Sequence, residues 1–263
     1  MYTFLHTNDF HGQLTETKAV CLQHKKEALG NNCLLLDTGD AVSSGNISFK
    51  LEGEPVHELM NRAGYDFAAP GNREFHILAQ AMHCKLKLSS FPFLCSNIFL
   101  SGEDISYSSE ENWLLGSRTS EIIHPAAISH TPSGKMIAIL GLMVPMVTRR
   151  MSARYISDYH FDQPIAAASQ LVPILRNKYK PDILIVLSHI GFTQDRKLAE
   201  TVPGIDLIIG GHSHTILDHG DRVGDTLIVQ TGSHGNKLGR VVWQDEENPS
   251  DQRRLTSSLE DIC

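Results

Sequence analysis

A repeated pattern limits how this chain can fold: short apolar runs, each followed by a polar loop. The runs are almost continuously apolar, which is typical of strands that are covered on both faces of a sheet. They predict strands within residues 3–7, 33–37, 65–70, 91–97, 136–142, 182–189, 206–214 and 226–232.

Helical patterns lie between these runs, at residues 15–29, 54–63, 76–88, 163–179 and 193–201. Strands that alternate with helices predict an α/β fold with a largely parallel or mixed sheet. The segment RVVW and the later RRLTSSLEDI predict a closing hairpin, and the Ser-rich residues 101–121 predict a surface insertion.

The charge and the cysteines exclude several classes of protein. A net charge of −7 without long Lys/Arg runs argues against a nucleic-acid polymer as partner. No signal peptide is visible, and the longest apolar stretch, residues 136–147, is too short to span a membrane. Five cysteines without a C-x-x-C motif argue against a disulfide framework and favour a reducing compartment. We therefore predict a cytoplasmic protein with no membrane partner; an exported mature form stays open.

Polar side chains with metal-binding capacity follow five of the predicted strands. In open α/β sheets, functional residues gather at the carboxyl ends of the strands. The candidates, in chain order, are Asp9, His11, Asp40, Asn72, His189, His212 and His214.

Taken alone, each of these motifs is typical of a turn or a surface loop. Together, imidazole and carboxylate ligands suit Zn, Mn, Fe or Ni, and the lack of thiolates argues against a closed structural zinc site. Seven ligands are too many for one open catalytic metal. They suit two metals that share a bridging carboxylate.

The segments HTNDFHG, DTGD, GN-x-E, SHIG and PGIDLIIGGHSHT resemble the motif set of the calcineurin-like metallophosphoesterases, in particular the 5′-nucleotidase and UDP-sugar hydrolase branch. The resemblance covers residues 2–243 and implies a four-layer α/β/β/α sandwich. It also implies that Asp9, His11, Asp40 and His214 hold a first metal. Asp40 would bridge to a second metal, completed by Asn72, His189 and His212.

The resemblance implies a function as well. It predicts hydrolysis of small phosphate esters, mono- or diesters and nucleotide-like substrates included, by a metal-activated water. The cofactors would be two divalent ions, with Mn, Zn, Fe and Mg as candidates. We predict a metallophosphoesterase domain at 1–243, a closing strand and polar tail at 244–263, and no C-terminal domain of the kind that grips the nucleobase in this branch.

The stretch GNREFH departs from the family pattern, which is usually GNHE followed by F-D. Arg73 replaces a histidine thought to stabilise the transition state or protonate the leaving group, and His76 replaces the aspartate that orients it. Three hypotheses follow. Arg73 stabilises negative charge electrostatically, His76 acts as the general acid, or the site binds metal with little turnover. A simple ion pair of Arg73 with Asp66 or Glu74 is the structural alternative.

Further candidates are less specific. Asn97 and His234 are predicted substrate contacts, with a strand-end turn as the alternative for Asn97. The carboxylates that would orient the histidine ligands are Asp37, Glu74 and Asp206. Two alternative functions remain open: a noncatalytic metal- or nucleotide-binding module, and a hydrolase of sulfur-linked groups on the same fold.

Overall fold

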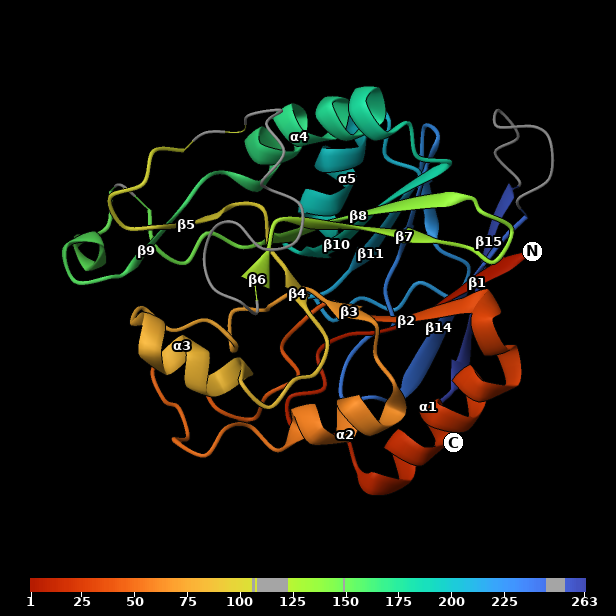
Figure 1. Cartoon of the computed structure of the whole chain (residues 1–263), viewed down its shortest axis with the longest axis horizontal. Coiled ribbons are helices and arrows are strands. Elements are labelled where there is room, and N and C mark those ends of the chain that lie inside the picture. Colours follow the sequence, from red (N-terminus) through yellow and green to blue (C-terminus); the bar gives the residue numbers. More distant parts are fainter. Residues whose placement is uncertain (106, 108–122, 149, 245–253) are drawn as a thin grey trace.

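The computed structural model describes residues 1–105, 107, 123–148, 150–244 and 254–263. Two sheets stack face to face between two layers of helices (Figure 1). Helices α1 (Glu16–Leu29), α2 (Val56–Ala63) and α3 (Ala79–Leu86) lie on one side, and α4 (Pro164–Tyr179) and α5 (Phe192–Thr201) on the other. The predicted α/β/β/α sandwich is confirmed.

The first sheet has the strand order β15-β14-β1-β2-β3-β4-β6. Its parallel strands are β1 (Tyr2–Thr7), β2 (Cys33–Asp37), β3 (Phe67–Ala68), β4 (Phe93–Leu94) and β6 (Ile123–His124). Strands β14 (Lys237–Trp243) and β15 (Leu255–Asp261) are antiparallel and form the predicted closing pair at one edge.

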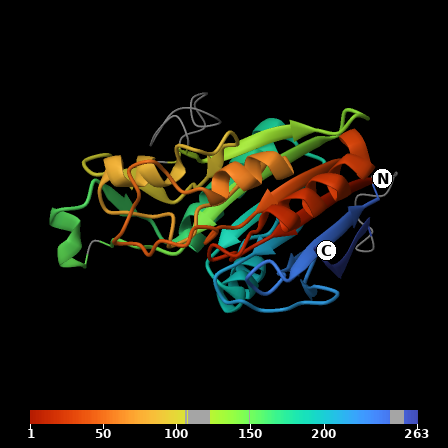
Figure 2. The same ribbon diagram turned by 90° about the horizontal axis from the view of Figure 1, so that it is seen from below.

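The second sheet has the order β12-β13-β11-β10-β8-β7. Strands β8 (Met136–Met143), β10 (Ile183–His189), β11 (Leu207–Gly210) and β13 (Thr226–Val229) run parallel. The antiparallel edges are β7 (Ala126–His130) and β12 (Asp221–Val223). A separate pair, β5 (Ile98–Leu100) and β9 (Tyr159–Phe161), lies beyond the sheets (Figures 1 and 2).

Three apolar cores separate the four layers. Alternate residues of one strand enter different cores, as the two-residue period of a strand requires. Leu35 packs toward α1 and α2, while its neighbours Leu34 and Leu36 pack between the sheets. Leu184 faces α4 and α5, whereas Ile183 and Ile185 face the first sheet. Burial on both faces explains why these runs show no polar alternation.

Most predicted elements are confirmed, and the differences lie in short segments. The run at 65–70 pairs only at Phe67–Ala68, and the run at 91–97 contains only Phe93–Leu94, before β5. Strands β5, β6, β7, β9 and β12 were not predicted, because short or half-exposed strands carry little pattern. Most of the predicted insertion at 101–121 lies outside the described residues.

The prediction from the cysteines is partly wrong. Cys21 of α1 forms a disulfide with Cys263, whereas Cys33, Cys84 and Cys95 are free and buried. Among the described residues, no helix has the length and apolarity needed to cross a membrane.

Candidate metal centre

The predicted metal ligands lie on loops with unusual backbone geometry. Asp9, His11, Asp40, His212 and His214 all have positive φ angles, between 50° and 71°. Residues other than glycine rarely adopt positive φ angles, and those that do are enriched at functional sites. The first-sheet loops also approach each other closely, since a Cβ on Gly39 would lie 2.2 Å from the Gly71 amide nitrogen.

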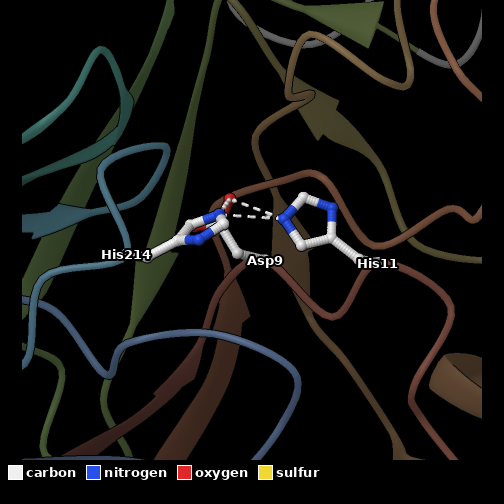
Figure 3. Close-up of side chains that lie close together, drawn as sticks. All are labelled: Asp9, His11 and His214. Carbon is white, nitrogen blue, oxygen red and sulfur yellow. Dashed lines mark hydrogen bonds and ion pairs between the residues drawn. The ribbon is translucent and has the colours of Figure 1, made fainter.

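One group of candidate ligands consists of Asp9, His11 and His214 (Figure 3). The Nε2 atoms of His11 and His214 are 2.9 Å apart, and they lie 3.6 and 3.3 Å from Asp9 Oδ1. Ligand atoms bound to one ion at about 2.1 Å are roughly 3.0–3.4 Å apart. The three side chains, which come from the first and the second sheet, therefore converge as ligands of one ion would.

The second group gathers around Asp40. His189 Nε2 lies 3.5 Å from Asp40 Oδ1 and 3.3 Å from Asn72 Oδ1, and His212 Nδ1 lies 2.9 Å from the same asparagine oxygen. Asp40 Oδ2 is 3.9 Å from His11 Nδ1, on the side of the first group. Asp9 also lies within 4.8 Å of the ligand atoms of Asp40 and His189, so the two groups share Asp9 and Asp40 approaches the first group at His11.

The electrostatics of the cluster favour bound cations. Burial raises the pKa of Asp9 to about 6. Burial and the Glu74 carboxylate raise the pKa of Asp40 to about 7. Burial lowers the pKa of His11 and of His212 to about 4, so these imidazoles are neutral at physiological pH. The neutral imidazoles give the buried carboxylates no compensating charge. Arg73 and Lys85 supply part of it to Asp40, and divalent ions would supply more.

Unpartnered atoms point to the same conclusion. Asp9 Oδ1 and His11 Nδ1 are buried and make no hydrogen bond. Such groups are costly unless a ligand satisfies them. The donor set of imidazole, carboxylate and amide oxygen fits Zn, Mn or Fe, as the sequence predicts.

Glu74 joins the loops that carry Asp40 and Asn72. Its carboxylate accepts the backbone N–H groups of Asp40 (2.8 Å), Ala41 (2.9 Å), Val42 (3.1 Å) and Gly71 (2.7 Å). Glu74 was predicted to orient the histidine ligands, but the donors in these four bonds are all backbone N–H groups. Glu74 holds backbone instead.

The acceptor for His189 is a backbone carbonyl. His189 Nδ1 donates to the Thr38 carbonyl at 2.6 Å, which leaves the Nε2 lone pair directed toward Asp40 and Asn72. Asp37 accepts hydrogen bonds from the Thr7 hydroxyl (2.6 Å) and the Gly39 amide (2.8 Å). Neither donor is a histidine, so these bonds hold the loop after β2.

The prediction for Asp206 is wrong. Its carboxylate accepts the Leu184 amide at 2.7 Å and pairs with Arg176 and Arg254. Asp206 precedes β11, so it lies at the opposite end of the strand from His212 and His214.

Arg73 lies beside the metal ligands, and it pairs with neither Asp66 nor Glu74. Its amide donates to Asp40 Oδ1 at 2.7 Å, its Nε is 3.9 Å from Asp40 Oδ2, and its Nη1 donates to the Ser43 carbonyl at 3.3 Å. Asp66 instead pairs with Lys26 at 2.7 Å. The Arg73 side chain is 37% exposed, so part of the guanidinium is open to solvent.

His76 is less well placed. It is 8% exposed, its Nδ1 accepts the Leu78 amide at 3.0 Å, and its ring packs edge-on against Phe49. Burial and the Lys85 ammonium lower its pKa, which disfavours the protonated form that a general acid needs.

The two predicted substrate contacts differ. The His234 ring is exposed, and its centroid lies 5.4 Å from that of His11 and 6.1 Å from that of His214. The structure contradicts the prediction for Asn97. Its side chain is fully buried and bonds to the backbone of Met143 and to the carbonyl of Asp162.

Two residues of the site were not singled out from the sequence. Asn8 donates to Asp9 Oδ2 at 2.8 Å and accepts from the Thr231 amide and hydroxyl. Lys85 is a fully buried lysine that donates to the Arg73 carbonyl. The polar Asn8 directly before the first ligand was a visible signal, whereas Lys85 had none beyond its place in an apolar helix.

Comparisons with known proteins agree with this geometry. Residues 2–215 match the calcineurin-like phosphoesterase family. The chain is 30% identical to the trifunctional nucleotide phosphoesterase protein YfkN of Bacillus subtilis (strain 168), over 91% of this chain and 18% of that protein. It is 29% identical to protein UshA of Yersinia enterocolitica, over 91% of this chain and 48% of that protein.

Among solved structures, a 5′-nucleotidase precursor from Thermus thermophilus has a TM-score of 0.73 at 22% identity, covering 99% of this chain and 54% of that one. This likeness shows the fold. The chain spans about half or less of the length of these relatives. The match over most of the chain shows that it belongs to the calcineurin-like phosphoesterase family, among relatives of the 5′-nucleotidases and UshA.

Proposed function

We propose that this protein hydrolyses small phosphate esters, mono- or diesters, at a centre of two divalent metal ions. The observation that carries the proposal is the pair of ligand groups, Asp9 with His11 and His214 and Asp9 with Asp40 and His189, at the carboxyl ends of strands from both sheets. Nucleotide-like substrates are the first class to test, because curated relatives are named nucleotidases.

In this proposal Asp9, His11, Asp40 and His214 hold one ion, and Asp40, Asn72, His189 and His212 hold the other. Bound divalent ions polarise phosphoryl oxygens and supply a hydroxide-like nucleophile near neutral pH. The chain contributes fixed ligand positions. Thr38 orients His189, Asn8 orients Asp9, and Glu74 fixes the loops of Asp40 and Asn72.

Arg73 is the residue we assign to the developing negative charge. Its partly exposed guanidinium lies beside Asp40, and a guanidinium binds phosphoryl oxygens through paired N–H groups. It cannot donate a proton near neutral pH, so esters with acidic leaving groups should react best. The buried His76, with its lowered pKa, is the weaker candidate. The exposed His234 ring is placed to donate a hydrogen bond to a substrate oxygen.

The first experiment measures bound metal and turnover on the same samples. Wild type should bind two ions and release phosphate or nitrophenol from a panel of mono- and diesters with Mn²⁺ or Zn²⁺. Asp40→Asn should lower turnover by more than about 100-fold, which is the upper range for changes outside the direct ligands. Asp261→Asn, a surface carboxylate on β15, is the matched control. If wild type and Arg73→His both bind metal stoichiometrically and neither shows turnover, the protein is a noncatalytic binding module.

The second experiment tests Arg73 with Arg73→His. An imidazole can donate a proton to the leaving oxygen, so the variant should gain on alkyl phosphates relative to aryl phosphates. The measurement is the ratio of kcat/KM for the two substrate types. An unchanged ratio would show that Arg73 does not act on the leaving group.

A further inference from the structure

Lys85, on α3, is a lysine with 0% exposure. Lysine is almost never fully buried unless its charge is paired. Its ammonium donates to the Gly45 carbonyl at 2.7 Å and also to the Arg73 carbonyl. Both acceptors belong to loops that follow strands of the first sheet and approach the metal ligands.

These two bonds of Lys85 fix the loop that carries Arg73 and the neighbouring loop at Gly45. The Arg73 amide is held by Asp40 and its carbonyl by Lys85, so the peptide units on both sides of Arg73 are fixed. The guanidinium donates to the Ser43 carbonyl, two residues before Gly45. Lys85 therefore holds both the backbone that carries the guanidinium and the loop against which it lies.

The charge around Lys85 supports a buried cation. Glu74 and Glu54 are 0% and 1% exposed, and both act electrostatically on Lys85, as does Asp40. Replacing a buried ionic link by apolar packing is often neutral or favourable for stability. A charged link here is therefore better explained by the position it imposes than by the stability it adds.

We propose that Lys85 is a positioning residue, which fixes the Arg73 guanidinium where it meets the leaving oxygen of the substrate. The proposal rests on the function proposed above for Arg73. It requires that Lys85 affect the reaction by way of Arg73. The substitution of Lys85 should therefore change the rate without changing folding or metal binding.

A double-mutant cycle tests this requirement with Lys85→Met, Arg73→Ala and the double variant, each in its metal-loaded form. Displacing a catalytic group by about 1 Å can cost on the order of 100-fold in rate. We expect Lys85→Met to lower kcat/KM by about 10–100-fold in wild type and by less than about threefold in Arg73→Ala. Equal losses in both backgrounds would overturn the proposal.

A leaving-group series supplies a readout that a purely structural role would not change. Removing Arg73 should steepen the dependence of kcat/KM on the leaving-group pKa across substituted aryl phosphates, and Lys85→Met should steepen it similarly. Lys87→Met is the matched control, because Lys87 is an exposed lysine at the end of the same helix that donates to the Leu51 carbonyl. It should leave rate and slope unchanged.

The outcomes separate the two proposals. If Arg73→Ala alters neither rate nor slope, the role of Arg73 fails and the Lys85 proposal fails with it. If Arg73→Ala has its expected effect but Lys85→Met leaves the slope unchanged, only the Lys85 proposal fails. Circular dichroism and metal content confirm that each variant is folded and loaded. If Lys85→Met does not fold, Lys85→Gln, which keeps a donor but not the charge, enters the same cycle.

Discussion

At the scale of single residues, Asp195 on α5 is a fully buried carboxylic acid. Ser188, the neighbour of His189, donates to its Oδ1, while Oδ2 has no hydrogen-bond partner. A Cβ on Gly210 would lie 2.6 Å from that Oδ2, so the glycine before the GHSH segment is required for this close contact. Burial raises the pKa of Asp195 to about 8.

This raised pKa predicts how stability changes with pH. The folded state keeps the Asp195 proton up to about pH 8, whereas the unfolded chain releases it near pH 4. Asp195 therefore lowers stability as pH rises through this window, by up to about 1.4 kcal/mol per pH unit. Asp195→Asn should flatten the decline, measured by urea unfolding between pH 4 and 8. Glu200→Gln, an exposed acid on the same helix, should not; an unchanged slope in Asp195→Asn would contradict the assignment.

At the scale of elements, the metal centre depends on how loops are tied to one another. The loops after β2 and β3 contribute Asp40 and Asn72, and Glu74 binds four of their backbone N–H groups. Charge-assisted bonds to a carboxylate are stronger than neutral ones. They hold the loop after β2 in the conformation in which Asp40 has a positive φ angle, and they tie that loop to the one that carries Asn72.

Glu74→Gln should disturb this arrangement. The glutamine amide presents a donor where the loops also present donors, so buried N–H groups lose their acceptor, each at a cost of about 1–3 kcal/mol. We expect lower stability and a metal affinity reduced about 10–100-fold. Thermal unfolding and Mn²⁺ titration measure both effects. Glu58→Gln, on the exposed face of α2, is the control; an unaltered Mn²⁺ affinity in Glu74→Gln would argue against the clamp.

At the scale of the whole molecule, the disulfide links distant parts of the chain. Cys21 lies on α1, and Cys263 follows β15, 242 residues later. The bond thus fastens the edge of the first sheet to the helix that covers it. Disulfides persist in oxidising compartments, so this bond argues against the cytoplasmic location that the cysteine count favoured.

Reducing this bond, or making the double variant Cys21→Ser/Cys263→Ser, should lower stability by about 2–4 kcal/mol. The metal ligands lie on other loops, so turnover at temperatures well below unfolding should not change. Thermal unfolding with and without reductant measures the effect, and the double variant should show no response to reductant. A reductant-insensitive wild type would show that the bond is not formed.

The sequence alone determined the α/β class and the seven candidate ligands, and the resemblance of its motifs to a known family implied the four layers. Apolar runs identify strands buried on both faces, and polar residues placed directly after them must meet where those strands end. Candidate ligands such as Asp9 and His212 could be proposed because their signal is local: each lies within a few residues of the strand that positions it.

Only the tertiary structure decided the roles of residues whose partners are distant in the chain. Asn97 is occupied by the backbone of Met143 and Asp162, Asp206 lies at the far end of its strand, and Cys21 meets Cys263. Lys85 of α3 donates to the Arg73 carbonyl in a loop that precedes the helix. Hydrogen bonding and burial depend on which segments the fold brings together, and a local pattern of residue types does not predict those contacts.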